Sequence, residues 1–169
     1  YHGFTIRALA AACGMSNAGM LHYFASKTEL LIAVIDHLEV LQSEGLQPQI
    51  ERCNAAVREG RYAMPEFRAL LATMVQQVRL DEELVRLVVV IQAESLDPAH
   101  PAYASFRRRE AAALEFLESM LAPLVSQPAA VARGLHAAMN GLAQQWLREG
   151  GAFDVMQTWE AVASRLLSE

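Results

Sequence analysis

The chain has 169 residues, of which 53% are hydrophobic and 20% are charged, and its formal net charge is −5. This composition can bury a substantial core and excludes an intrinsically disordered protein. No apolar run approaches the roughly 20 residues that cross a bilayer, so no membrane partner is expected. Two cysteines, Cys13 and Cys53, are too few and too distant for a disulfide framework or a zinc cluster. They predict a protein of the reducing cytoplasm, with both thiols acting as small core residues.

Helical patterns begin almost at the start of the chain. The first helix is predicted over residues 6–13, with Thr5 as its N-cap. Gly14 can adopt a positive φ in the turn that follows, and Ser16 can cap a short second helix over residues 17–23. Because the chain does not begin with methionine and a helix starts so early, we expect a further segment upstream.

The rest of the chain is also predicted to be helical, with Gly and Pro between segments. Ser26 and Glu29 form a capping box that opens a long helix, which is expected to stop at residues 45–48. Further helices are predicted over residues 49–59, from Pro65, after Asp81, from Pro101 to about Leu121, from Pro128 to about Arg148, and from about Asp154 to Leu167. The predicted fold class is all-α, with a helix-turn-helix DNA-binding module in residues 1–43 and a multi-helix effector-binding and dimerisation domain in residues 44–169.

Residues 6–23 carry the most specific pattern. Two helices cross steeply over a short turn only where a small residue separates their backbones, and Ala10 with Gly14 four residues later meets this requirement. Five apolar residues are predicted to plug the junction: Leu9, Cys13, Met15, Met20 and Tyr23. The second helix then presents a small and polar face, as a helix in the major groove requires: Ser16, Asn17, Ala18, Gly19, Leu21 and His22.

An ordinary helical hairpin is the alternative, because the Ala-x-x-x-Gly spacing alone also fits it. The full set of plug positions, the serine cap and the short second helix favour DNA binding. Gly19 adds to this, since glycine in an exposed helix costs about 1 kcal/mol relative to alanine and close approach to DNA can offset that cost. Arg7, Lys27 and Glu29 leave residues 1–31 slightly positive, so the acidity lies in the remainder of the chain.

The motif resembles the signature of the TetR family of transcription regulators, through Gly3-Phe4-Thr5-Ile6, Leu9-Ala10, Cys13-Gly14-Met15-Ser16 and Tyr23-Phe24-x-Ser26-Lys27-x-x-Leu30. The resemblance implies that Thr5 contacts phosphate and that His22 contacts phosphate or a base. It implies that Lys27 contacts phosphate through its charge and the helix dipole. The base-reading edge would be Ser16, Asn17, Ala18 and Gly19. The family's first helix, which packs beneath this motif, would precede Tyr1.

One position departs from the family pattern. Leu21 stands where most members have a tyrosine whose hydroxyl reaches phosphate. A branch of the family reads Leu-Leu-His-His-Phe here, and Met20-Leu21-His22-Tyr23-Phe24 is similar to that sequence. A leucine can either contact a thymine methyl group or pack within the protein.

The last two predicted helices carry more apolar surface than one core contact needs. A row of small residues follows the first of them beside an apolar stripe, and the second has two adjacent apolar stripes. We expect a four-helix homodimer interface that includes Gly134, Ala138, Gly141, Gln145, Trp159, Val162 and Leu166. The family's dimerisation through its last two helices agrees with this interface. The alternative is that both surfaces pack within one subunit.

A ligand pocket is predicted among the middle helices. Its candidate lining suits a hydrophobic or aromatic effector and comprises Met74, Val78, Val89, Gln92, Phe106 and Met120, although such residues at helical spacing also fit a plain core. Glu94, Asp97 and His100 could be read as metal ligands, but turn and cap roles account for them more simply. No metal and no cofactor is expected.

These patterns together predict a ligand-responsive DNA-binding transcription regulator. It would act as a repressor, released from its operator by a small hydrophobic effector. The alternative is an all-helical adaptor protein with a non-functional DNA-binding head. An enzyme is not expected, because the sequence offers no nucleophile–base pair, no Gly-rich phosphate loop and no metal-ligand set.

Overall fold

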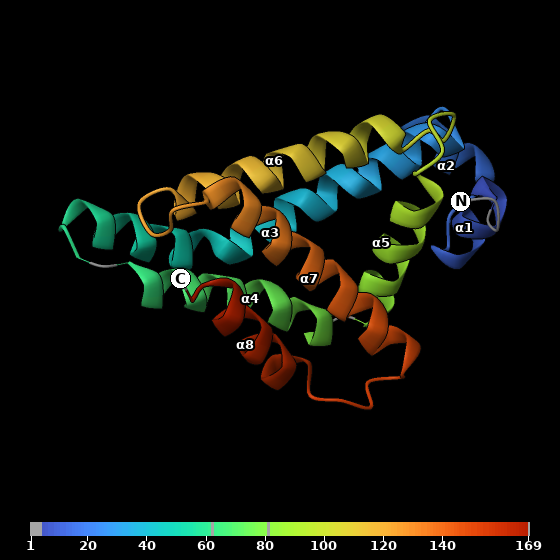
Figure 1. Ribbon diagram of the computed structural model, residues 1–169. Coiled ribbons are helices and arrows are strands. Elements are labelled where there is room, and N and C mark those ends of the chain that lie inside the picture. Colours follow the sequence, from blue (N-terminus) through green and yellow to red (C-terminus); the bar gives the residue numbers. More distant parts are fainter. Residues whose placement is uncertain (1–4, 62, 81, 169) are drawn as a thin grey trace.

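The computed structural model describes residues 5–61, 63–80 and 82–168, and within these ranges the chain forms eight helices and no strand (Figure 1). The predicted all-α fold class is confirmed. The motif residues Gly3 and Phe4 and the predicted cap Asp81 lie outside the described ranges. The helices are α1 Ile6–Ala12, α2 Asn17–Tyr23, α3 Lys27–Arg58, α4 Met64–Leu80, α5 Glu82–Glu94, α6 Tyr103–Leu121, α7 Pro128–Arg148 and α8 Val155–Leu166.

The two short N-terminal helices form a head at one end of the molecule, beside the start of α3 (Figure 1). The long α3 runs away from this head, and α4 to α8 form the rest of the body. Within the body α3 packs on α4, α6 packs on α7, and α8 packs on both α4 and α7. None of the helices in the described ranges has the length and apolar character to cross a membrane.

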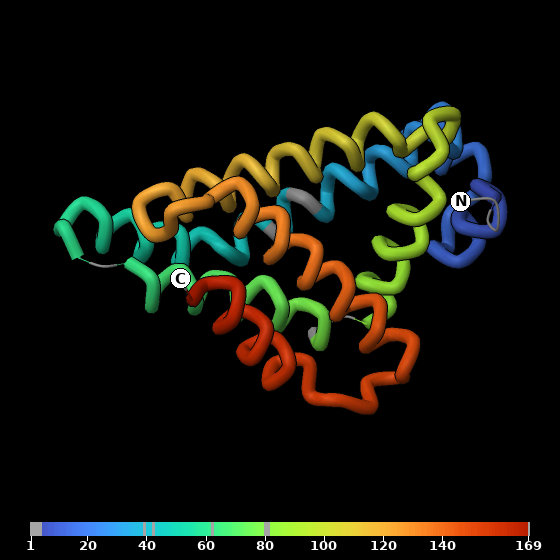
Figure 2. Tube along the Cα trace, in the orientation of Figure 1, coloured from blue at the N-terminus to red at the C-terminus, as the bar shows by residue number. Residues whose placement is uncertain are grey.

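Helix α3 is one continuous element of 32 residues, and Pro48 lies inside it. The trace in Figure 2 shows no break there, so the predicted stop at residues 45–48 is wrong. A proline inside a helix costs about 3 kcal/mol. Burial on both sides of it offsets this cost, through Leu38 before Pro48 and Cys53 and Ala56 after it. The proposed division between residues 43 and 44 falls within this helix and stays a prediction.

Buried apolar residues form two clusters. The larger lies where α3, α4, α6, α7 and α8 meet, and its most deeply buried large side chains include Trp159, Phe67, Leu71, Leu117 and Leu135. The smaller joins α3 to α5 and to the start of α6 near the head, through Leu31, Ile35, Ile91, Ala102 and the half-buried Phe106. The head therefore adjoins a small core of its own, while most of the hydrophobic stabilisation lies deeper in the body.

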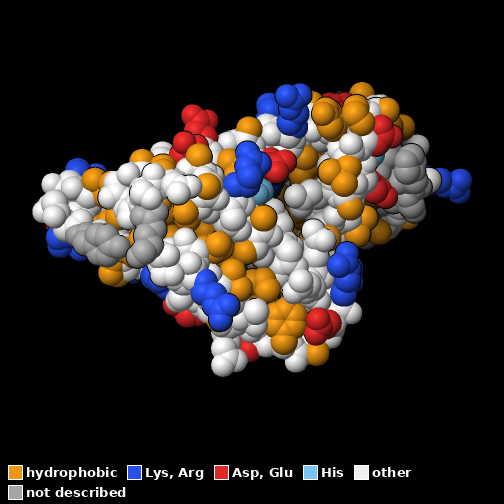
Figure 3. All heavy atoms as spheres, viewed as in Figure 1, with side chains coloured by type: hydrophobic (Ala, Val, Ile, Leu, Met, Phe, Trp, Pro, Cys, Tyr) orange, Lys and Arg blue, Asp and Glu red, His pale blue; other side chains and the backbone are white. Residues whose placement is uncertain are grey.

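Large apolar side chains that stay exposed are distributed over several elements, and hydrophobic groups are scattered over the face in Figure 3. They are Leu21, Tyr23, Val40, Leu41, Val57, Leu87, Val90 and Leu96. Two of them lie on α5, where Ile91 is the fully buried residue. Because α5 buries so little, we expect it to open locally more readily than α7.

The observed starts of α7 and α8 agree with the predicted ones, whereas that of α6 does not. Pro128 is at the first position of α7, and Asp154 caps α8 by accepting bonds from the backbone N–H groups of Met156 and Gln157 at 2.9 and 3.1 Å. The prediction that Pro101 opens the next helix is wrong, since α6 begins only at Tyr103. The residues before Tyr103 form turns instead.

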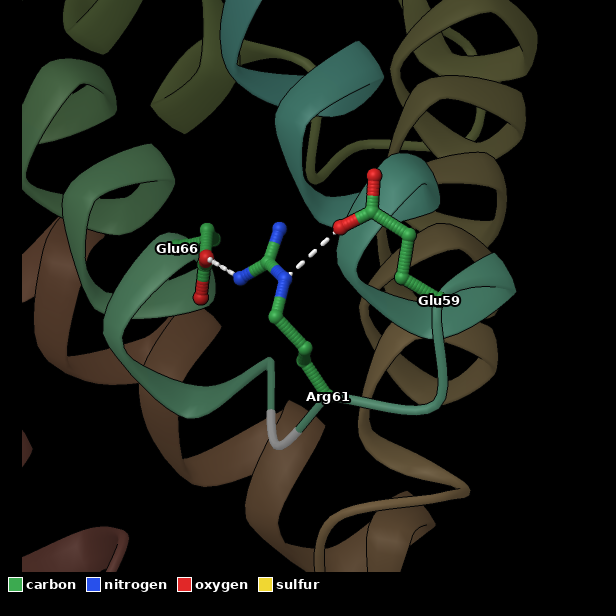
Figure 4. Close-up of polar contacts among 3 residues, drawn as sticks. All are labelled: Glu59, Arg61 and Glu66. Atoms are coloured by element: carbon green, nitrogen blue, oxygen red, sulfur yellow. Dashed lines mark hydrogen bonds and ion pairs between the residues drawn. The ribbon is translucent and has the colours of Figure 1, made fainter.

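Arg61 connects the end of α3 to the start of α4 (Figure 4). Its Nε donates to Glu59 Oε2 at 2.7 Å, and its Nη1 donates to Glu66 Oε1 at 2.6 Å. The hydrogen bond that Arg61 donates to Glu66 lowers the pKa of the Glu66 carboxyl. The pKa of Arg61 is raised, first by its hydrogen bond to Glu59 and then by its hydrogen bond to Glu66. This cluster bridges the two helices.

The Arg61 cluster predicts a pH dependence. The lowered pKa of Glu66 stabilises the fold at pH values above the ordinary carboxyl pKa of 4.5, and this contribution is lost as the pH falls through the folded-state pKa. Arg61→Gln should therefore lower the free energy of unfolding at pH 7. On acidification, the free energy of unfolding of this variant should fall by less than that of the wild type. Urea unfolding at pH 7 and pH 4 measures this difference. Arg148→Gln removes one charge from an exposed position and is the control; an equal pH response in all three proteins would contradict the prediction.

Candidate nucleic-acid interface

A side-chain cap begins each short helix of the head. Thr5 Oγ1 accepts a hydrogen bond from the backbone N–H of Ala8 at 3.1 Å, and Ser16 Oγ accepts one from Gly19 at 2.9 Å. Each bond satisfies an N–H group that has no partner within its helix. The predicted caps Thr5 and Ser16 are confirmed.

The turn between α1 and α2 depends on a glycine. Gly14 has a φ of +67°, in the left-handed region that favours glycine over residues with a side chain. The backbone N–H of Met15 then donates to the carbonyl of Ala10 at 2.8 Å, which closes the turn. Ala10 is 1% exposed and Met20 is 5% exposed where the helices cross. The helix-turn-helix predicted from Ala10 and Gly14 is thus present.

The predicted plug of the junction is only partly correct. Met20 is buried and Leu9 and Met15 are half-buried, but Cys13 is exposed and Tyr23 is 67% exposed. Both exposed residues stand at the ends of seven-residue helices, beyond the short contact where α1 and α2 cross. The expectation of two core thiols is likewise wrong for Cys13, whereas Cys53 is fully buried.

The outward face of α2 has the predicted composition. Asn17, Ala18 and His22 are exposed, and Leu21 is 41% exposed between them. Gly19 is half-buried, and a Cβ atom built on it would lie 3.1 Å from Ser16 Oγ. The absence of a side chain at Gly19 therefore also protects the cap of α2, a reason that the sequence did not reveal. The result is an exposed face dominated by small and polar groups, with one leucine at its centre.

Helix α3 begins directly beside this face. Ser26 Oγ accepts from the N–H of Glu29 at 3.1 Å, while Glu29 Oε2 accepts from the N–H of Ala25 at 2.8 Å. The glutamate thus reaches the residue before the cap, a variant of the predicted capping box. Lys27 is the first residue of α3, where its charge adds to the positive end of the helix dipole. Lys27 and Arg7 give the described part of the head two positive charges, and Glu29 gives it one negative charge.

The predicted pocket residues are divided between different parts of the body. Met74 and Met120 pack against the larger cluster, and Phe106 packs against the smaller one. Val78 is 9% exposed, and Val89 and Gln92 are half-buried on α5. Met120 also lines a cavity of about 190 Å³ between α3, α4 and α6. A smaller cavity of about 110 Å³ lies beside Asp36, Ser105, Arg108, Arg109 and Ala112.

The predicted interface residues differ in what they can offer a second chain. Trp159 is 1% exposed within the core of its own chain, so its side chain has no surface for a partner. A Cβ atom on Gly134 would lie 3.4 Å from Leu166 Cδ2, so the close approach at this glycine is made within one chain. Ala138, Gly141 and Val162 are half-buried, Gln145 is exposed, and a Cβ on Gly141 would meet nothing within 4 Å.

The acidic and histidine residues between α5 and α6 take turn roles. Asp97 Oδ1 accepts from the N–H of Ala99 at 2.9 Å, and His100 Nδ1 accepts from the N–H of Ala102 at 3.2 Å. His100 Nε2 lies 3.8 Å from Glu94 Oε2. In the described ranges, no three His, Cys, Asp or Glu residues are grouped to hold a metal ion.

Comparison with known proteins identifies the head. Residues 1–34 match the family described as bacterial regulatory proteins, tetR family. This segment contains α1, α2 and the first turns of α3. No curated protein and no solved structure matches the chain. The match therefore covers the residues whose caps, turn and exposed face are described above.

Proposed function

We propose that the chain, whose residues 1–34 match the TetR family, is a DNA-binding transcription regulator. It would act in the cytoplasm as a homodimeric repressor that a small hydrophobic effector releases from its operator. The observation that carries the proposal is the exposed face of α2, held between the turn at Gly14 and the capped start of α3. A face of this kind is suited to entering the major groove.

In the proposed complex the residues of the head divide into two groups. Asn17, Ala18 and His22 meet base edges, because they form the exposed side of α2. Thr5 and Lys27 meet phosphates on either side. The Thr5 oxygen accepts the cap bond from Ala8, which leaves its hydroxyl hydrogen to donate to phosphate.

The proposed dimer pairs α7 and α8 with the same helices of a second copy. Its surface uses Ala138, Gly141, Gln145 and Val162, which keep solvent exposure in the single chain. The open space over Gly141 permits close approach of a second helix backbone. Twofold pairing would place two heads on half-sites about 34 Å apart. An effector that favours a body with a different head separation would then release the operator.

The first test measures binding of the full protein to the DNA upstream of its own gene. We expect a salt-sensitive, sequence-specific complex in an electrophoretic shift assay and a dimer by light scattering. Asn17→Ala should weaken the specific complex by about 5- to 200-fold, since a bidentate base contact contributes about 1–3 kcal/mol. Gln157→Ala, an exposed substitution on α8, is the control. A stable dimer that shows no specific complex would instead favour an adaptor protein.

Leu21 gives a second prediction for the head. Its exposure at the centre of the α2 face favours contact with a thymine methyl over packing within the protein. Replacing the contacted thymine by uracil should weaken wild-type binding about 4-fold, because burying one methyl contributes about 0.8 kcal/mol. Leu21→Ala should remove this sensitivity, and Leu87→Ala, a comparably exposed leucine on α5, should retain it. Equal sensitivity of all three proteins would contradict the contact.

A further inference from the structure

We infer that the cavity at the end of the body farthest from the head binds a small, neutral aromatic molecule and is the effector site of the regulator. The effector role, but not the binding itself, rests on the function proposed above. The cavity has a volume of about 190 Å³. It lies between the last turns of α3, the start of α4 and the end of α6, at the opposite end of Figure 1 from α1 and α2. Its lining residues are Cys53, Asn54, Val57, Ala63, Phe67, Ser119, Met120, Pro123 and Leu124.

The lining carries no side chain with a formal charge at neutral pH. None of its nine residues is Lys, Arg, Asp, Glu or His, and burial raises the pKa of the Cys53 thiol, with the nearby Glu66 as the second cause. Cys53 therefore stays protonated at neutral pH. An anionic ligand would lose hydration here without gaining an opposite charge from the lining, so the cavity favours a neutral ligand over an anionic one.

The lining also holds a few polar groups that can orient a ligand. Ser119 Oγ donates to the carbonyl of Phe116 at 2.7 Å, so its hydrogen is occupied and its lone pairs can still accept. The amide of Asn54 lies on the same cavity. Ser119 therefore favours a ligand with a hydroxyl or amine hydrogen, while the amide of Asn54 can both donate and accept. Size sets a second limit, since an apolar cavity of about 150 Å³ holds one benzene molecule. We expect a single aromatic ring with one or two further heavy atoms.

The position of the cavity connects it to the head through α3. Cys53, Asn54 and Val57 belong to the same unbroken helix that begins at Lys27. The distance along this helix from Lys27 to Cys53 is about 39 Å at 1.5 Å per residue. Nearer the head, Arg109 Nη1 on α6 donates to the carbonyl of Ile35 on α3 at 2.9 Å. A ligand that separates α3 from α6 at the cavity would therefore tilt α3 about its second contact with α6, at Arg109 and Ile35. Such a tilt would move the start of α3, beside the head.

Binding to the full protein can be tested with three simple probes: phenol, toluene and benzoate. Titration followed by NMR should show saturable binding of phenol and toluene and none of benzoate. Ser119→Ala should weaken phenol binding about 2- to 10-fold, the effect of one lost hydrogen bond, and leave toluene binding unchanged. Benzoate binding as tight as that of phenol would overturn the assignment, as would binding of none of the probes.

A matched pair of substitutions locates the site. Val57→Trp should fill the mouth of the cavity and abolish binding of phenol, whereas Val90→Trp places the same ring on α5, away from the cavity. The two valines are 50% and 46% exposed, so both proteins should fold, which thermal unfolding checks. Loss of phenol binding in Val90→Trp, or its persistence in a folded Val57→Trp, would overturn the site.

The regulatory part is tested with the operator complex. Phenol should dissociate the wild-type and Val90→Trp complexes and leave the Val57→Trp complex intact. Phenol that binds the cavity without weakening the complex would overturn the effector role and leave the DNA-binding function standing. A protein that forms no specific DNA complex would refute the proposed function, and the titrations without DNA would still decide whether the cavity binds its ligand.

Discussion

Replacing Ala10 by leucine is expected to abolish specific binding to the operator while leaving the body folded. Ala10 is 1% exposed where α1 crosses α2, and its carbonyl accepts the hydrogen bond from Met15 that closes the turn. Inserting a larger side chain into such a contact costs about 1–3 kcal/mol. The two helices of the head have seven residues each, so they have few other contacts with which to offset this cost.

Ala11→Leu is the control for this experiment, because Ala11 lies on the same helix and is exposed. It should bind the operator as the wild type does. Shift assays measure DNA binding, and thermal unfolding of the body should give the same midpoint for all three proteins. Wild-type affinity in Ala10→Leu would show that the two helices of the head do not need the close crossing described above.

The largest effect on stability is expected from Trp159→Ala. Trp159 is 1% exposed in the larger cluster, where α8 packs on α4 and α7. Removing a buried tryptophan ring leaves a cavity as well as losing transfer free energy, so the free energy of unfolding should fall by about 3–5 kcal/mol. Urea unfolding at two protein concentrations measures the loss and separates it from any effect of dimer dissociation.

Trp146→Ala is the matched control for that substitution. Trp146 is half-buried near the end of α7, and its ring lies beside Gly151. Its removal should destabilise the protein clearly less than the removal of Trp159. A loss of less than 1 kcal/mol for Trp159→Ala would mean that the core does not close around α8 as described.

The features that could be predicted from the sequence are those encoded by neighbouring residues. Thr5, Ser16 and Asp154 cap helices because each hydroxyl or carboxylate bonds to an N–H two or three residues later. Gly14 sets its turn through its own backbone conformation. Such contacts need no knowledge of the rest of the fold, which explains why the caps and the turn of the head could be predicted.

The errors arose where packing between distant segments decides the outcome. A proline predicts the end of a helix at Pro48, but α3 continues past it because Cys53 and Ala56 are buried. The apolar stripe of the last helix predicts Trp159 at a dimer interface, but the residue is buried within its own chain. An apolar stripe does not reveal which of its sides meets its own subunit. The cavity of about 190 Å³ is lined by residues 53–57 and by residues 119–124. No local sequence pattern could indicate that these distant segments lie side by side.

The unbroken length of α3 makes the molecule sensitive to small angles. A rigid rod of 32 residues is about 48 Å long, and a tilt of about 5° displaces one end by about 4 Å relative to the other. One base-pair step of the duplex is about 3.4 Å. A tilt of this size would therefore move each reading helix by more than one base-pair step along the DNA.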